Sequence, residues 1–116
     1  MSSILVIDDD SAFLNMLKIA LERFGHYVET AANGEEGVRK FYDGLFDLVI
    51  TDIRMCGMDG NAVAHQISNS PYPSTPIVGI SGTPQLLENR VFNTVISKPF
   101  SIKVLIDCVS NLSMGK

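Results

Sequence analysis

The sequence has few of the features of a secreted, membrane-spanning or nucleic-acid-binding protein. Two cysteines among 116 residues are too few for a disulfide scaffold, so reduced thiols and a cytoplasmic location are expected. No apolar run reaches the ~18 residues of a membrane-spanning helix, and no basic-then-apolar signal segment opens the chain. Nine basic and thirteen acidic residues give a net charge of −4, which argues against direct contact with nucleic acid.

The composition does support one folded domain over residues 1–116. Hydrophobic residues make up 46% of the chain and charged residues 19%, which is enough apolar surface for a real core. Domains typically have ~100–150 residues, so a second module of ordinary size has no room. The sequence shows no internal repeat, low-complexity tract or linker.

Short apolar runs predict buried β-strands. They are Ile4–Ile7, Leu48–Ile50, Ile77–Ile80 and Val95–Ile96. Each run is rich in β-branched residues and is bounded by polar or turn residues, as in parallel strands that helices cover on both faces. Tyr27–Ala31 alternates more strongly and predicts an edge strand.

Amphipathic helical patterns lie between and after these runs. The expected N-caps are Asp10 or Ser11, Asn33, Asp59, Thr83 and Ser101. The expected inward faces are Phe13, Leu17, Leu21 and Phe24 in the first helix, and Val38, Phe41 and Tyr42 in the second. Strand and helix therefore alternate five times, which predicts an α/β fold with a parallel sheet covered on both faces.

Polar residues follow the predicted strands at the points where they end. With the edge strand counted as the second of five predicted strands, Asp8, Asp9 and Asp10 follow the first strand, Asp52 the third, Ser81 the fourth and Lys98 the fifth. Because ligands of open α/β sheets bind beyond the carboxyl ends of the strands, these side chains are expected to converge. Clustered carboxylates repel one another, and Mg²⁺ with its preference for oxygen ligands relieves that repulsion. A carboxylate can also act as a nucleophile, so the pattern predicts a Mg²⁺-dependent phosphoryl-acceptor site.

The same residues resemble the receiver domain of two-component response regulators, as in the chemotaxis regulators. The matching residues are Asp8 and Asp9, Thr51 and Asp52, Met58-Asp59-Gly60, Ser81, and Lys98-Pro99-Phe100. The resemblance covers essentially the whole chain and implies a flavodoxin-like doubly wound sheet of strand order 2-1-3-4-5. It also implies a phosphoryl donor, which is a sensor histidine kinase or a phosphotransfer protein. The output would be a partner protein or an output domain outside this sequence, and a dimer formed on phosphorylation is one option.

The resemblance also assigns roles to single residues. Asp52 is the expected phospho-acceptor. Asp9 and Asp52 are expected to bind Mg²⁺ directly, Asp8 mostly through water, and Arg54 through its backbone carbonyl. Ser81 and Lys98 are expected to hold the phosphoryl oxygens, and the bond between Lys98 and Pro99 is commonly cis in the family. Arg54 and Thr83 occupy positions that tune dephosphorylation, and Asp10 is expected to cap a helix.

Some positions depart from the family pattern. Val95 stands three residues before Lys98, where many receivers have the aromatic residue that changes rotamer on phosphorylation. Lys98 comes only 17 positions after Ser81, so several residues of the fourth helix and of the loop before the fifth strand are missing relative to the family. This spacing predicts a shortened fourth helix and a non-standard output surface. Cys56 stands where many receivers have proline, close to the expected phosphorylation site.

Two other functions remain open at this stage. Val95 and the short fourth helix favour a degenerate receiver that acts as a phosphorylation-independent binding scaffold. An aspartyl phosphohydrolase would use Asp8 and Asp10, but the length leaves no room for the cap domain of such enzymes. Under the receiver interpretation, the chain is a phospho-acceptor signalling domain and not an enzyme. Its only catalysis would be its own phosphorylation and dephosphorylation. A nucleotide-binding role is weak, since the sequence has no Gly-x-Gly-x-x-Gly or Walker-type loop.

Overall fold

Strands and helices alternate along the chain, as the sequence predicts. The computed structural model describes residues 2–55, 57–82, 92–97 and 101–114. Its elements are β1 (Ser3–Ile7), α1 (Ser11–Arg23), β2 (Tyr27–Ala31), α2 (Gly34–Asp43), β3 (Leu48–Asp52), α3 (Gly60–Ser68), β4 (Ile77–Ser81), β5 (Thr94–Ser97) and α4 (Ile102–Met114). Within these ranges, no helix is both long enough and apolar enough to cross a membrane.

The strands form one parallel sheet in the order β2-β1-β3-β4-β5, which confirms the flavodoxin-like order. Ile4 in β1 lies between Val28 of β2 and Leu48 of β3. Every residue of β3 and β4 is buried, which explains why these strands are apolar on both faces. Tyr27 at the start of β2 is exposed, as expected for an edge strand.

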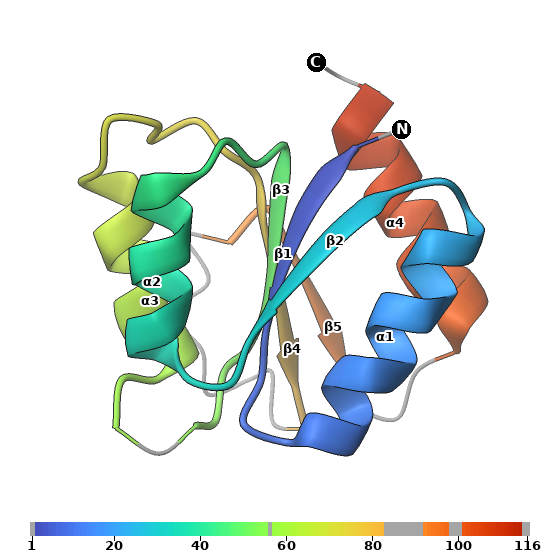
Figure 1. Ribbon diagram of the computed structural model, residues 1–116, viewed down its shortest axis with the longest axis horizontal. Helices are drawn as coiled ribbons and strands as arrows, with labels where there is room; N and C mark the ends of the chain where they lie inside the picture. The colour runs from blue at the N-terminus through green and yellow to red at the C-terminus, as the bar shows by residue number, and fades with distance from the viewer. Residues whose placement is uncertain (1, 56, 83–91, 98–100, 115–116) are drawn as a thin grey trace.

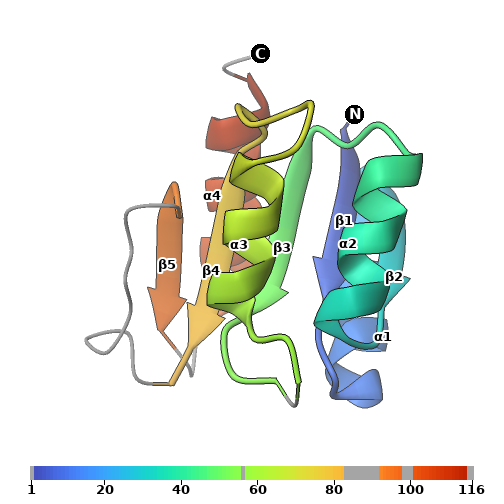
Figure 2. The ribbon, with the colours of Figure 1, turned by 90° about the vertical axis from the view of Figure 1, so that its left-hand side faces the viewer.

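The helices α1 and α4 cover one face of the sheet, and α2 and α3 cover the other (Figures 1 and 2). Alternate residues of β1 point to opposite faces, so Ile4 and Val6 pack with α1 and α4, and Leu5 and Ile7 pack with α2 and α3. The two resulting hydrophobic cores hold the strand ends in place, and the polar residues that follow the strands are thereby brought to one edge of the sheet.

The predicted N-caps within the described residues are confirmed. Asp10 accepts hydrogen bonds from Ala12 N and Phe13 N, Asn33 from Glu36 N, Asp59 from Ala62 N and Ser101 from Val104 N. The Glu36 side chain also reaches back beyond the start of α2, where its Oε1 accepts a hydrogen bond from Ala32 N at 2.7 Å, one residue before the cap Asn33. This hydrogen bond is the main reason why the pKa of Glu36 lies below its ordinary value.

Two of the predicted inward-facing residues are exposed instead. Phe24 is 61% exposed because α1 ends at Arg23 and the chain turns away at Gly25, whose φ is +88°. Tyr42 is 44% exposed; its ring lies edge-on to buried Phe41. The apolar pattern of the first helix therefore continues past its end, and that of α2 is wider than the buried face of the helix.

The shortened fourth helix that the sequence predicts after Ser81, with its Thr83 cap, lies outside the described residues, and so does Cys56. It is not the helix labelled α4.

Gly37 lies inside α2 although glycine weakens helices, and its contact with the sheet gives a reason. A Cβ at Gly37 would overlap the side chain of Ile7 in β1. A larger residue at this position would force the Ile7 side chain or the helix to move.

Candidate functional site

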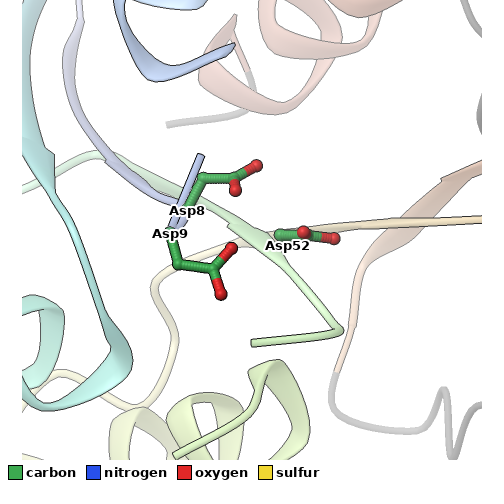
Figure 3. Close-up of side chains that lie close together, drawn as sticks. All are labelled: Asp8, Asp9 and Asp52. Carbon is green, nitrogen blue, oxygen red and sulfur yellow. The ribbon is translucent and has the colours of Figure 1, made fainter. Parts of the chain in front are cut away.

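Three aspartates meet at the carboxyl ends of β1 and β3. Asp52 is the last residue of β3, and Asp8 and Asp9 follow β1 directly. Because β1 and β3 are neighbours in the sheet, the three side chains lie side by side (Figure 3). One carboxylate oxygen from each residue lies within 4.8 Å of the other two. The expectation that Asp8, Asp9 and Asp52 come together is therefore confirmed, whereas Asp10, which was expected at the same edge, is not part of this cluster.

The donor set of this cluster fits Mg²⁺. Asp8 and Asp52 are only 2% and 7% exposed, whereas Asp9 is exposed, so the cluster is open on one side. Carboxylate oxygens are the ligands that Mg²⁺ prefers, and the open side leaves room for the waters it usually keeps. Burial makes repulsion between the carboxylates costly, so a divalent cation at this point would stabilise the folded chain.

Backbone hydrogen bonds hold Asp8 in place. Asp8 N donates to Ala31 O of β2 at 3.1 Å. Asp8 Oδ1 accepts a hydrogen bond from Asp10 N at 2.9 Å. The carboxylate of Asp10 caps α1 and is not in the cluster, so the prediction that Asp10 is a helix cap is confirmed.

The backbone of Asp52 is held by two residues that match the family pattern but to which the sequence assigns no role. Thr51 Oγ1 donates to Asp52 O at 2.9 Å. Gly60, the first residue of α3, donates its N–H to Ile53 O at 2.9 Å and lies directly against the Asp52 carbonyl. The sequence pattern marks Thr51 only as the neighbour of Asp52 and does not predict its hydrogen bond. The Gly60 contact depends on the path of the chain between β3 and α3, which no local pattern reveals.

The other predicted site residues are placed as follows. Ser81 ends β4, beside β3, and is 2% exposed. Arg54 is exposed, two residues beyond Asp52. Lys98 and Thr83 lie outside the described residues. Val95, in β5, is half-buried against the core that contains Leu5, so an aliphatic side chain fills the position of the usual aromatic switch.

Comparison with known proteins decides the family. Residues 4–110 match the response regulator receiver domain. The chain belongs to the response regulator receiver family. Among curated proteins, this receiver is 33% identical over 106 residues to the transcriptional regulatory protein ResD of Bacillus subtilis, with 86% of this chain and 43% of ResD covered. It is 40% identical over 67 residues to the transcriptional regulatory protein AfsQ1 of Streptomyces coelicolor, with 58% of this chain and 30% of AfsQ1 covered. The receiver thus spans less than half the length of these relatives.

Solved structures share the whole fold of this receiver. The response regulator TrrA from Thermotoga maritima, in complex with Mg(2+)-BeF, has a TM-score of 0.89 and 33% identity, covering 97% of this chain and 99% of TrrA. The chemotaxis response regulator CheY4 of Vibrio cholerae has a TM-score of 0.90 and 26% identity, covering 97% and 98%. The fold and the family expected from the sequence are therefore both confirmed.

Proposed function

We propose that this receiver accepts a phosphoryl group onto Asp52 in a Mg²⁺-dependent reaction, and that the phosphoryl group switches a protein-interaction surface. The observation that carries the proposal is the approach of the Asp8, Asp9 and Asp52 carboxylates within 4.8 Å of one another. Membership of the receiver family and the Mg(2+)-BeF complex of its relative TrrA support the same function.

Asp9 and Asp52 would hold Mg²⁺ directly, Asp8 mostly through water, and Arg54 through its backbone carbonyl. When bound, Mg²⁺ would neutralise negative charge that develops on the transferring phosphoryl group. A carboxylate oxygen of Asp52 attacks phosphorus and forms the acyl phosphate. The phosphorus–nitrogen bond of a phosphohistidine donor breaks, and its electron pair returns to the imidazole.

Ser81 and Lys98 are proposed to bind the phosphoryl oxygens. Ser81 supports this role because it ends the strand beside β3 and offers a hydroxyl donor at the same edge of the sheet as Asp52. Lys98 would add a positive charge, which stabilises the developing negative charge in a site that excludes water. Arg54 and Thr83 would set how fast water removes the phosphoryl group, and the exposed Arg54 could shield it.

The proposed donor is a sensor histidine kinase or a phosphotransfer protein in the cytoplasm, where ATP and Mg²⁺ are available. Phosphorylation would shift an equilibrium between two surface states, so the chain acts as a signalling domain and not as an enzyme that turns over a separate substrate. The relatives are transcriptional regulators of which this receiver covers only 30% and 43%, which supports an output partner, an output domain or a phosphorylation-dependent dimer. Because Val95 replaces the usual aromatic residue, the signal must leave the site through other side chains.

Incubation with acetyl phosphate, with and without Mg²⁺, tests this function by intact-mass spectrometry. Wild type should gain one phosphoryl group only with Mg²⁺, and Asp52→Asn should gain none. Asp10→Asn is the matched control, because Asp10 follows the same strand and asparagine also caps helices. It should be phosphorylated like wild type. A wild-type chain that stays unmodified with Mg²⁺ would instead favour a phosphorylation-independent binding scaffold.

A further inference from the structure

The first residue of α3 lies unusually close to the backbone of Asp52. A Cβ on Gly60 would lie 2.6 Å from Asp52 O and 2.7 Å from Ile53 Cα. Both atoms belong to the backbone, so neither can rotate away as a flexible side chain would. Any residue larger than glycine would have to move α3 or the end of β3.

Space, and not backbone conformation, requires glycine at this position. Among the described glycines, only Gly25 and Gly57 have a positive φ, and Gly60 therefore has a conformation that alanine adopts easily. Alanine also has a higher helix propensity than glycine. A substitution at Gly60 thus acts mainly through its contact with Asp52 and Ile53.

The peptide that follows Asp52 is held from several sides. Thr51 Oγ1, which is fully buried, donates to Asp52 O at 2.9 Å. Ile53 N donates to Ile80 O of β4 at 3.0 Å, and Ile53 O accepts from Gly60 N at 2.9 Å. The carbonyl of Asp52 thus lies between a hydroxyl donor and the start of α3, and its direction is fixed.

We propose that Gly60 and Thr51 are positioning residues for the Asp52 carboxylate. They act through the Asp52 backbone: Gly60 allows α3 to lie against the carbonyl, and Thr51 donates to it. This inference rests on the proposed function of Asp52 as phospho-acceptor. A shift of the backbone moves the carboxylate away from Asp8 and Asp9 and misaligns it for attack on phosphorus, while the core of the domain stays folded.

Gly60→Ala tests the proposal against a control on the same helix. Ile67 is buried near the other end of α3, so Ile67→Ala destabilises the domain without touching Asp52. Stability is measured by urea unfolding, Mg²⁺ affinity by titration calorimetry, and phosphorylation rate with acetyl phosphate, at a temperature where both variants are folded. Gly60→Ala should lose Mg²⁺ affinity and about tenfold or more in rate, and Ile67→Ala should lose neither. Equal losses in the two variants would overturn the proposal.

Thr51 gives a second test that remains available if Gly60→Ala does not fold. Thr51→Val keeps the shape but removes the hydroxyl, and Thr51→Ser keeps the hydroxyl but removes a methyl group. The rate should fall in the valine variant and be restored in the serine variant, even though serine leaves a small cavity. A rate that follows stability instead would refute the role of Thr51.

The experiments distinguish a failure of the proposed function of Asp52 from a failure of the positioning role of Gly60 and Thr51. If wild type binds Mg²⁺ but stays unphosphorylated, the proposed function fails, and Mg²⁺ affinity alone decides the positioning role. If wild type is phosphorylated and both Gly60→Ala and Thr51→Val react at the wild-type rate, the positioning proposal fails and the proposed function stands.

Discussion

Replacing Asp52 with asparagine should stabilise the metal-free receiver and reduce its stabilisation by Mg²⁺. Asp8 and Asp52 are both buried, and their carboxylate oxygens lie within 4.8 Å of each other. At this separation two like charges repel by about 1 kcal/mol in water and about 3 kcal/mol at an effective dielectric constant of ~20. Asp9 is exposed, so solvent reaches the cluster and screens this repulsion, and we expect a net gain of about 1 kcal/mol, at the lower end of this range.

The assay is urea unfolding followed by circular dichroism, first with a metal chelator and then with Mg²⁺. Mg²⁺ at ten times its dissociation constant should stabilise wild type by about 1.4 kcal/mol. Asp52→Asn should be the more stable protein in chelator and should gain less from Mg²⁺. Asp10→Asn, which leaves the three clustered carboxylates in place, should behave like wild type in both conditions. A loss of stability in the Asp52→Asn variant in chelator, or an unchanged gain from Mg²⁺, would refute the reasoning.

Three further predictions concern other parts of the chain. His26 Nδ1 accepts a hydrogen bond from Ser2 N, and burial, followed by the positive amino terminus, lowers the pKa of His26 below its ordinary value of 6.5. As the pH falls, the unfolded chain binds a proton at His26 before the folded chain does, so the free energy of unfolding should fall as the pH drops below about 6.5. His26→Gln should flatten this slope in urea titrations, and an unchanged slope would contradict the prediction. Phe41 is 1% exposed, so Phe41→Ala should cost about 3–5 kcal/mol in urea unfolding; a cost below about 1 kcal/mol would contradict its place in the core. Arg54→Ala should shorten the lifetime of the acyl phosphate, measured by its decay after the donor is removed, and an unchanged lifetime would exclude shielding by Arg54.

Local patterns in the sequence were sufficient to predict most of the fold. Runs such as Ile4–Ile7 are apolar on both faces because helices cover both sides of β1. Asn33 and Asp59 cap their helices through side-chain oxygens a few residues from the N–H groups they satisfy. Such interactions depend on neighbours in the sequence, and that is why the positions of the elements could be predicted.

The site was predictable where a topological rule linked distant residues. Asp8, Asp9 and Asp52 meet because strand ends of a parallel sheet share one edge. No such rule exists for the contact of Gly60 with the Asp52 carbonyl, which depends on the path of the loop between β3 and α3. Tyr42 shows the same limit on the helix surface, since an apolar pattern cannot tell where the sheet beneath a helix ends.

The most direct test of the central claim locates the phosphoryl group itself. Borohydride reduces an acyl phosphate but leaves a free carboxylate unchanged, so treatment after phosphorylation converts only the acceptor aspartate to homoserine. Tandem mass spectrometry of the digested protein then identifies the modified residue. The account predicts homoserine at Asp52 alone, and only when Mg²⁺ and the phosphoryl donor are both present. Homoserine at Asp8, Asp9 or Asp10, or at Asp52 without Mg²⁺, would contradict it.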